Sequence, residues 1–538
     1  MEGRRSWQAP FALGKADELD YAGALRVATD TGFFGSTDDP LLETVVEMLD
    51  ELGRPDEAYR CLQVAGTNGK TSTSRYASAA LAAAGMRVAL YTSPELVSMT
   101  ERMEVGGRPV SEVQFAHGVS YAATAGRRVN ARREAAGLRP YRVTEFDLLT
   151  CAACVVFAEA GVDVAVLEVG LGGRWDATSA VARTCAATVT GIGLDHMKIL
   201  GDTLEKIACE KAAVIRPGNP CVLGTNAVRP AGVLAVMLAR CAEVGARPTV
   251  VAKAGEPVLP AAEGLPRCTY EVTHAPSHLG DALTLDVDVQ VWVLARGAAS
   301  GLREEALLAA GEGAAHADSA ADSQGGVAGA RVGSGRDGGS REGRLVSARY
   351  EGVSLVAPIY QAQNVACALA LATAVAGGSI PVDSVRAAIA ACPTPGRFEV
   401  VRAEPLALID ACHNPQSAEA FRAALVQVEP DRAARPTLVF ATLADKDHRG
   451  IVRVVAPLFD RIVVTQSDSE RALPAERLGD EVREEVAARA AGGDAQGWDP
   501  QVSVAPTLAD ALARLEGQPF VCCGTITVVG ELKGMLAR

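Results

Sequence analysis

A short loop rich in glycine carries the residue types that binding a chain of phosphates requires. It reads Val64-Ala65-Gly66-Thr67-Asn68-Gly69-Lys70-Thr71 and is followed by Ser72. Glycines let backbone N–H groups turn toward an anion, Lys70 would reach the outer phosphates of a nucleotide, and the Thr71 hydroxyl would face a bound magnesium ion. Val64 stands where a complete Walker A motif has glycine, so these letters also fit a tight strand-to-helix turn.

The segments around this loop would hold it at the edge of a sheet. The apolar run 61–64 predicts a buried strand, and the alanine-rich run 72–84, which stops at Gly85, predicts a helix. A second strand at 87–91 completes a β-α-β unit, so we expect a parallel sheet. The loop then lies at a helix N-terminus, where the helix dipole favours negative charge.

Polar residues follow the predicted strands at the place where parallel sheets bind ligands. Ser93 follows the second strand, Glu168 ends a strand at 162–169, and His196 follows a strand at 186–192. Because ligands bind at the carboxyl ends of such strands, we expect these residues near the glycine-rich loop as magnesium ligands. Magnesium prefers oxygen ligands, so His196 also fits an ordinary loop histidine.

Further charged residues are candidates for the same site, each with a structural alternative. Lys211 lies in a predicted helix at 203–215 that could face the same strand ends, or it could be a surface lysine paired within its own helix. Arg397, Asp410 and His413 lie beside or after a Pro-Gly hinge at 393–396, where structural capping is the alternative.

The remaining pattern predicts two α/β domains, residues 1–393 and 394–538. We expect 298–342, which is rich in Gly, Ala, Ser and charged residues and lacks aromatic residues, to be a disordered insertion. Helices are predicted at 39–52, 114–139, 145–160 and 361–376, with an irregular stretch at 95–108. Strands of the second domain are predicted at 406–410, 437–441, 460–465, 501–505 and 519–523.

Composition argues against several classes of partner. The chain has 538 residues, a formal net charge of −13 and a pI near 5.2, which disfavours nucleic acid or an anionic membrane surface as the main partner. No window approaches the ~20 apolar residues of a membrane span, and the start lacks a signal-peptide core, so we expect a cytoplasmic protein. The 13 cysteines are expected to be reduced, and the Cys151-x-x-Cys154 pair to pack within a helix, with redox or metal chemistry as the alternative.

Together these residues resemble the folylpolyglutamate synthase/dihydrofolate synthase family, within the Mur-ligase-like ATP-dependent amide ligases. The matching motifs span most of the chain in the family's order. They are Ala65-Gly66-Thr67-Asn68-Gly69-Lys70-Thr71, Thr92-Ser93-Pro94 with Glu101-Arg102, Thr144-Glu145-Phe146, Glu168-Val169-Gly170-Leu171-Gly172-Gly173-Arg174 with Asp176-Ala177-Thr178, Leu194-Asp195-His196, Glu210-Lys211-Ala212, Pro395-Gly396-Arg397-Phe398, Asp410 with His413-Asn414-Pro415, Asp445-Lys446-Asp447, and Cys523-Gly524.

The resemblance implies an α/β fold, with an N-terminal P-loop ATPase domain on a mostly parallel sheet and a smaller C-terminal Rossmann-like domain. It also implies a reaction: ATP phosphorylates a carboxylate of dihydropteroate or a reduced folate, and the amine of L-glutamate then displaces phosphate to form an amide. Two Mg2+ ions would be the cofactor and ATP a co-substrate. The partners would be these small molecules, without nucleic acid or membrane, and we expect a monomer.

The resemblance assigns residues to roles in that reaction. The ATP site would comprise Gly66, Thr67, Asn68, Gly69, Lys70, Thr71, Ser72, Asn364, Arg397 and Asp410. The metal ligands would be Thr71, Ser93, Glu168 and His196, and the catalytic residues Lys70, Lys211, His196 and Arg397, with Lys211 carbamylated. The substrate site would comprise Thr144, Glu145, Phe146, Asp147, Trp175, Asp176, Ala177 and His413.

Some positions depart from the family's pattern, and two alternatives stay open. Trp175 stands where a smaller aliphatic residue is common and Glu95 where a histidine is, which bears on the pterin side of the site and not on ligation. One alternative is a Mur-type ligase that adds an amino acid to a nucleotide-linked peptidoglycan precursor. The other is a nucleotide-binding regulator without catalysis. The 145–147 and 174–178 segments favour the folate interpretation, and the retention of the charged residues argues against a regulator.

Overall fold

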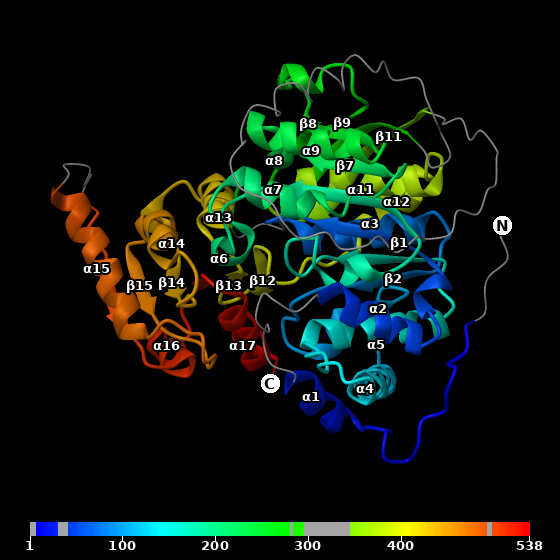
Figure 1. Cartoon of the computed structure of the whole chain (residues 1–538). Coiled ribbons are helices and arrows are strands. Elements are labelled where there is room, and N and C mark those ends of the chain that lie inside the picture. The colour runs from blue at the N-terminus through cyan, green and yellow to red at the C-terminus, as the bar shows by residue number, and fades with distance from the viewer. Residues whose placement is uncertain (1–6, 31–40, 280–282, 295–344, 492–497, 538) are drawn as a thin grey trace, which may run out of the picture.

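Two β-sheets organise the molecule (Figure 1). The computed structural model describes residues 7–30, 41–279, 283–294, 345–491 and 498–537, so the insertion predicted at 298–342 lies outside the described residues. The first sheet has 11 strands and the second has six. The predicted α/β class, with a larger and mostly parallel sheet followed by a smaller one, is confirmed. We call the elements around the first sheet the first-sheet region, and those from β12 to α17 the second-sheet region.

The first sheet is parallel in its middle and antiparallel at both ends. Its order is β11-β10-β9-β8-β7-β6-β1-β5-β2-β3-β4, and the pairs from β2 to β9 are parallel. The strands are β1 (Arg60–Ala65), β2 (Val88–Tyr91), β3 (Met103–Val105), β4 (Arg108–Pro109), β5 (Val164–Glu168), β6 (Thr184–Gly191), β7 (Pro220–Gly224), β8 (Arg247–Lys253), β9 (Arg267–His274), β10 (Thr284–Leu294) and β11 (Leu345–Val356).

The register of three neighbouring strands brings their carboxyl ends together. β1 lies between β5 and β6, and its Val64 pairs with Glu168 while its Ala65 pairs with Val189. β1 runs straight into the glycine-rich loop and the helix α3 (Lys70–Ala83), and α6 (Met197–Leu200) follows β6. The loop, Glu168 and the segment after β6 therefore meet at one edge of the sheet.

Helices cover both faces of the parallel strands, which explains why these strands are apolar throughout. One face packs on α3, α11 (Gln361–Ala376) and α12 (Val382–Ala390). The other face packs on α1 (Tyr21–Thr29), α2 (Leu41–Glu51), α4 (Glu112–Ala135), α5 (Glu145–Glu159), α7 (Leu204–Ala212), α8 (Thr225–Val228) and α9 (Ala231–Glu243). No helix among the described residues is long and apolar enough to cross a membrane.

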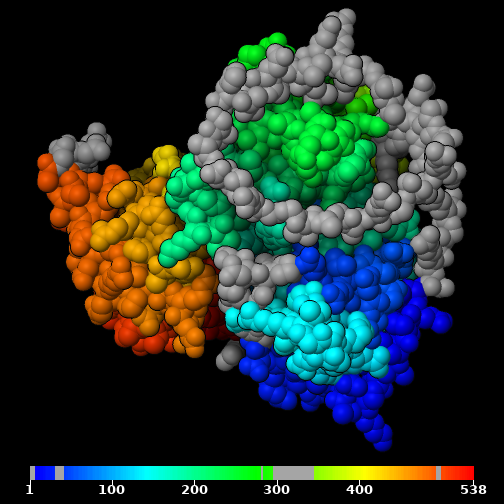
Figure 2. All heavy atoms as spheres, viewed as in Figure 1, coloured from blue at the N-terminus to red at the C-terminus, as the bar shows by residue number. Residues whose placement is uncertain are grey.

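The second sheet carries its own helices on both faces. Its order is β12 (Glu399–Arg402), β13 (Ala407–Asp410), β17 (Phe520–Cys523), β14 (Thr437–Phe440), β15 (Arg461–Val464) and β16 (Gln501–Val504), parallel except for β12. One face packs on α13 (Pro415–Val428), α14 (His448–Val455) and α15 (Ala475–Ala491), the other on α16 (Leu508–Arg514) and α17 (Ile526–Leu536). The second-sheet region forms a lobe beside the rest of the molecule, orange and red in Figure 2.

Most predicted elements occur close to their expected bounds, and the differences have local causes. The 95–108 stretch is not irregular throughout, because it holds the 3-10 helix η2 (Met99–Arg102), β3 and β4. The helix predicted at 114–139 begins earlier because Ser111 and Gln114 form a capping box, and it ends before Gly137, whose φ is 71°. The edge strand β12 was not predicted. Cys151 and Cys154 are buried in α5, as predicted for packing residues.

Candidate active site

The glycine-rich loop is held in place from β6 and α11. Gly66 and Gly69 have φ of 146° and 86°, in the left-handed region that favours glycine. A Cβ on Gly66 would lie 2.0 Å from the Thr190 hydroxyl oxygen, and one on Gly69 would lie 2.5 Å from Oδ1 of Asn364. Thr190 also donates to the carbonyl of Asn68 at 2.6 Å. Both glycines are therefore required by close packing as well as by backbone conformation.

Thr67 and Ser72 fix the two ends of this loop. The Thr67 hydroxyl accepts from the N–H of Gly193 at 3.0 Å and donates to its carbonyl at 3.1 Å. Ser72 is buried and accepts from the Gln361 amide at 3.0 Å, and that amide's oxygen accepts from Asn364 at 2.7 Å. Gln361 was not predicted, although it lies one turn before Asn364 on α11, a spacing that places both on one face.

Two lysines contact the backbone carbonyls of the loop. Lys70 is half-buried and its ammonium donates to the Thr67 carbonyl at 3.3 Å. Lys211 is buried and donates to the Gly66 carbonyl at 3.0 Å. Burial lowers the pKa of Lys70, against the opposing charges of Glu168 and Asp195. Burial, together with the charge of Lys70, lowers the pKa of Lys211 to about 7.

Glu168 accepts hydrogen bonds from two of the other predicted metal ligands, Thr71 and Ser93. It is 2% exposed, and it accepts from the Thr71 hydroxyl at 2.9 Å and from the Ser93 N–H at 3.4 Å. Burial raises its pKa, while Lys70 and these two donors oppose that rise. The structure thus places a desolvated carboxylate and a hydroxyl beside the position that the outer phosphates of a nucleotide would occupy.

His196, the fourth predicted metal residue, makes its contacts on the other side of the loop. It precedes α6 with φ of 51°, and its Nε2 lies 3.4 Å from the Lys446 ammonium and 3.9 Å from Asp195. Burial lowers the pKa of His196 to about 4; the charge of Asp195 opposes this lowering, and the charges of Lys446, Lys70 and Lys211 add to it. A neutral imidazole of this kind can serve as a metal ligand.

Asp410 at the end of β13 is held by donors from three elements. Its Oδ2 accepts from the Tyr360 hydroxyl at 2.8 Å and from the Phe398 N–H at 2.9 Å, and its Oδ1 accepts from the Cys412 N–H at 2.8 Å. Burial raises the pKa of Asp410, and the charge of Arg397 opposes the rise. A carboxylate accepts about four hydrogen bonds, so one acceptor position remains for a ligand. Tyr360 was not predicted.

Side-chain amides join the glycine-rich loop to the second-sheet region. Asn68 donates to the Gln416 amide oxygen at 2.8 Å, and Asn414 donates to the Asn68 oxygen at 3.1 Å. Gln416 also donates to the carbonyl of Ile192 at 3.3 Å. The Asn68 side chain, predicted to contact ATP, therefore contacts the start of α13 in this structure. Gln416 directly follows the His-Asn-Pro motif, which is the sequence pattern that could have identified it.

Asp195 is the centre of the ionic contacts between the two regions. The Lys446 ammonium lies 2.8 Å from Oδ1 of Asp195, Asn414 donates to its Oδ2 at 3.3 Å, and His413 lies 3.6 Å from the same oxygen. Burial by itself would raise the pKa of Asp195, but His413, Lys446 and His196 together hold it well below its ordinary value. Asp195 and Lys446 were part of the quoted motifs but were not assigned to the site.

Several residues predicted to line the substrate site also have structural partners. Thr144 and Asp147 form the capping box of α5, and burial raises the pKa of Asp147 to about 6. Asp176 caps the 3-10 helix η3 (Ala177–Ala180), where Ala177 is buried. Phe146 lies beneath Gly170, where a Cβ would come within 2.7 Å of its ring. Glu145 pairs with Arg102 at 2.7 Å, and Trp175 is 54% exposed.

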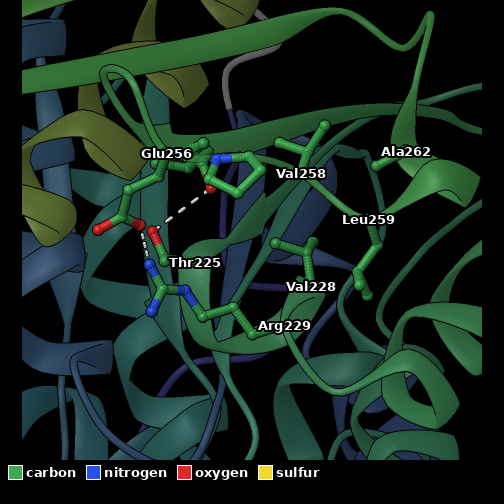
Figure 3. A pocket seen from close by; sticks show the side chains of 10 residues that line it. Thr225, Val228, Arg229, Glu256, Val258, Leu259 and Ala262 are labelled. Atoms are coloured by element: carbon green, nitrogen blue, oxygen red, sulfur yellow. Dashed lines mark hydrogen bonds and ion pairs between the residues drawn. The ribbon is translucent and has the colours of Figure 1, made fainter.

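Exposed apolar side chains flank this edge, and a separate pocket lies away from the loop. Leu194, Met197 and Ile199 are exposed on the segment around His196, as Trp175 is after β5. The pocket, of about 520 Å³, lies beside α8 and β8, with apolar walls and an ion pair between Arg229 and Glu256 (Figure 3). These two charges pair with each other, whereas the lysines at the loop contact backbone carbonyls.

Two family models match the chain in the order of its sheets. The Mur ligase middle domain matches residues 64–224, from β1 to β7, and the glutamate ligase domain of Mur ligases matches residues 396–519. The fold thus belongs to an ATP-dependent ligase of the Mur ligase class.

Comparison with individual relatives identifies the family within this class. The chain is 33% identical over 448 residues to the dihydrofolate synthase/folylpolyglutamate synthase of Mycobacterium tuberculosis, with 82% of this chain and 77% of that protein covered. It belongs to the folylpolyglutamate synthase/dihydrofolate synthase family of ATP-dependent acid–amino-acid ligases. The structure of M. tuberculosis folylpolyglutamate synthase complexed with ADP superposes with a TM-score of 0.72, at 27% identity, covering 96% of this chain and 99% of the other.

Another relative is longer, and this chain matches only part of it. The probable bifunctional folylpolyglutamate synthase/dihydropteroate synthase of Haloferax volcanii is 30% identical over 508 residues, with 93% of this chain covered. The chain spans 49% of that protein, about half its length.

Proposed function

We propose that this site joins L-glutamate to the carboxylate of dihydropteroate or a reduced folate through an acyl phosphate. One observation carries the proposal: two lysines with lowered pKa values and the buried Glu168 surround one phosphate-binding loop. Arg397 in the hinge lies close enough to this loop for its charge to lower the pKa values of Lys70, Glu168 and Asp410.

Charge neutralisation and positioning would supply most of the catalysis. A carboxylate that attacks a triphosphate brings two anions together, so cations placed in advance lower the barrier. Lys70 would neutralise the outer phosphates from the loop and Arg397 from the hinge. The contacts of Asn68, Asn414 and Gln416 across the two regions would keep water from the acyl phosphate while the amine of glutamate attacks it.

The donors around Glu168 fit magnesium, which we propose as the cofactor. Its carboxylate, the Thr71 hydroxyl and Ser93 offer oxygen ligands, and a buried carboxylate needs a cation nearby. Magnesium is usually held by one or two carboxylates with substrate phosphates, which agrees with finding no group of three or more His, Cys, Asp or Glu side chains for a metal in the described part of the chain. Bound magnesium would neutralise charge on the transferred phosphoryl group.

Lys211 and His196 would serve a second magnesium ion. The lowered pKa of Lys211, about 7, leaves a large neutral fraction near pH 7, and the neutral amine is the form that reacts with CO₂. Carbamylation would turn a cation into an anionic oxygen ligand. We propose this modification for Lys211, with His196 as a nearby neutral ligand.

The substrate side of the proposal rests on the loops after β5 and β6. The exposed Trp175, Met197 and Ile199 offer apolar surface for an aromatic substrate, while Phe146, Asp147 and Asp176 fix the loops that carry it. Thr144, Glu145, Ala177 and His413 complete the proposed substrate site. We further propose that residues 1–393 and 394–538 are the two domains, and that the enzyme is a cytoplasmic monomer, as the acidic composition and the free cysteines favour.

Substrate-dependent phosphate release tests the proposal. Purified protein with ATP and magnesium would be assayed with dihydropteroate, with tetrahydrofolate and with a muramyl nucleotide, each with and without L-glutamate. Glutamate-dependent release with either pterin substrate is the expected result, and the two arms show which of the two activities is present. Release only with the muramyl nucleotide would support the Mur-type alternative, and nucleotide binding without turnover in every arm would support a regulator.

A further inference from the structure

A short loop after β2 runs from the proposed metal carboxylate to the second-sheet region. At its start, the Ser93 N–H lies 3.4 Å from a carboxylate oxygen of Glu168. Three residues later, Leu96 packs against the apolar cluster of the second sheet that includes Val529 and Leu532 of α17. The loop 93–98 therefore touches both the catalytic edge of the first sheet and the last helix of the chain.

One carboxylate holds the second half of this loop by accepting hydrogen bonds from its backbone N–H groups. The Glu101 side chain accepts from the N–H groups of Leu96, Val97 and Ser98 at 3.0, 3.3 and 3.3 Å. Such charge-assisted hydrogen bonds are about twice as strong as neutral ones. Leu96 is therefore held against η2, and only Pro94 and Glu95 separate it from Ser93.

The loop is also tied to the substrate side. Arg102 is buried and lies 2.5 Å from Glu95 and 2.7 Å from Glu145, the first residue of α5. Since α5 begins at the capping box of Thr144 and Asp147, the position of Glu95 is coupled to residues of the proposed pterin site. Glu95 is thus one partner of a buried guanidinium and is not free to shift independently.

Two glycines and a valine form the notch that receives Leu96. A Cβ on Gly396 would lie 3.5 Å from one methyl of Leu96 and 3.4 Å from a methyl of Val529. A Cβ on Gly530, in the interior of α17, would lie 2.0 Å from the Leu96 carbonyl oxygen. Backbone meets backbone at this point, so no side-chain rearrangement can relieve the overlap. The approach of the loop to α17 requires glycine at position 530.

Hydrogen bonds and an ion pair connect the notch to the neighbourhood of Arg397 and Asp410, two of the proposed ATP contacts. The Gly396 N–H donates to Glu399 at 2.7 Å, and Glu399 pairs with Lys533 of α17 at 2.6 Å. The Gly396 carbonyl accepts from the N–H of Ala411, next to Asp410, at 2.8 Å. Arg397 follows Gly396 directly, so these contacts connect the helix α17, the hinge and the proposed ATP contacts.

We propose that the seating of Leu96 against Gly530 sets the orientation of the second-sheet region for catalysis. Leu96 and Gly530 are positioning residues: they act through Arg397, Asp410 and Ser93 and touch no reacting atom. Because Glu95 and Glu145 share Arg102, the same contact links the proposed pterin site to the placement of the hinge. This inference rests on the proposed ligase function, but its test separates the two.

Gly530→Ala is the primary test, with Gly534→Ala as its matched control. Both glycines lie in α17, and a Cβ on Gly534 would meet nothing within 4 Å. Alanine favours a helix interior in both variants. Only Gly530→Ala forces the loop and the helix apart, by about 1 Å, a misplacement that can cost on the order of 10²-fold in rate. We expect kcat to fall at least tenfold in Gly530→Ala, with the KM of the pterin substrate within threefold of wild type.

Hydrogen exchange of the loop amides tests the contact separately, because a change in the stability of α17 alone would not alter it. In Gly530→Ala the amides of 96–98 should exchange faster than in Gly534→Ala. The loss of kcat in Gly530→Ala should be larger than a lowered melting temperature can explain. Equal kcat values in the two alanine variants would overturn the proposal. An inactive wild-type protein would instead overturn the proposed function and leave the exchange comparison to test the contact.

A second pair of variants covers the case in which Gly530→Ala does not fold. Leu96→Ala removes the side chain from the notch without adding atoms, and Val97→Ala changes its neighbour, whose side chain is 54% exposed. We expect Leu96→Ala to lower kcat several-fold and to speed exchange at 394–397, and Val97→Ala to match wild type in both measurements. Wild-type kcat and exchange in Leu96→Ala would contradict the seating role.

Discussion

The two sheets of this chain present different chemistry at their carboxyl ends. The first sheet ends beside two lysines, Lys70 and Lys211, whose pKa values burial lowers, together with the buried carboxylate of Glu168. The second sheet ends in Asp410, whose oxygens already accept three hydrogen bonds from the protein. We therefore propose that the first edge receives a polyanion and cations, and that the second mainly holds a fixed geometry.

The contacts between these edges follow from the same difference. Lys446 and His413 of the second-sheet region meet Asp195 of the first, and their charges hold the pKa of that carboxyl well below its usual range. Ionic and amide contacts of this kind depend on orientation, so they can form or break as the two regions move. Variants at the end of the first sheet, the binding edge, should therefore differ in effect from variants at the contacts that orient the second sheet, the orienting edge.

Lys70→Ala should have the largest effect, because it removes charge from the edge that we propose binds the phosphates. We expect ligation to fall about 10³-fold or more, as when a group that stabilises transition-state charge is lost. ATP-dependent product formation and thermal unfolding would be measured together. Lys206→Ala, at an exposed lysine of α7, is the control and should keep both properties. Near-normal turnover in Lys70→Ala would show that the nucleotide binds elsewhere.

Lys211→Ala should be nearly as damaging, about 10²-fold, if the side chain becomes an anionic metal ligand. A small carboxylic acid such as acetate or formate, added to this variant, should restore part of the activity by supplying the missing carboxylate. Mass spectrometry or crystallography with magnesium and nucleotide should show the carbamate in the wild-type protein. An unmodified ammonium under those conditions, or a variant with full activity, would contradict the role.

The pKa of Lys211 also predicts how stability depends on pH. Its folded-state value of about 7 lies below the ordinary 10.5, so the unfolded chain binds more protons between these values. In CO₂-free buffer the burial of Lys211 should therefore cost most below pH 7, and the cost should disappear as the pH rises toward 10. Relative to Lys211→Met, the wild-type free energy of unfolding should rise over this range. A difference that does not change with pH would contradict the shift.

Lys446→Met tests the orienting contacts, and a smaller effect is expected. It removes the ion pair with Asp195 but leaves the phosphate loop intact, so kcat should fall about tenfold to a hundredfold through misplacement of the second-sheet region. Lys198→Met, at an exposed lysine of α6, is the matched control. Steady-state kinetics with varied ATP would measure both. A loss as large as that of Lys70→Ala would mean that Lys446 belongs to the binding edge itself.

Replacing 298–342 with a short Gly/Ser linker should have the smallest effect. Leu294 and Leu345 pair as neighbours in the antiparallel β10 and β11, so a short connection can join these strands. β11 is also the edge strand farthest from β2, β5 and β1 in the sheet order. We expect ligase activity within a few-fold of wild type and an unchanged melting temperature. Loss of activity in a folded deletion variant would assign the segment a role in catalysis.

Local patterns in the sequence predicted the elements that carry the binding edge. Strand, loop and helix around Lys70 are encoded by an apolar run, two glycines and an alanine-rich run, all within a short stretch of chain. Glu168 was found because it ends an apolar strand, and α11 was predicted with its observed bounds. The short strands β3, β4 and β12 were missed, because two to four residues are too few to show a periodicity. The strands β7 to β11 were not predicted either.

The sequence by itself thus determined the glycine-rich loop between β1 and α3, its neighbouring carboxylate and the succession of the two sheets along the chain, because each depends on residues close together in the chain. Only the tertiary structure decided that Thr190 and Gln361 support the loop, that Gln416 and Lys446 meet it from the second-sheet region, and that α17 needs glycine at position 530. The tertiary structure also decided the pKa values of Lys211 and Asp195, because burial and charges from distant segments set them. These features depend on distances between atoms that are remote in sequence, and such distances exist only once both sheets have packed.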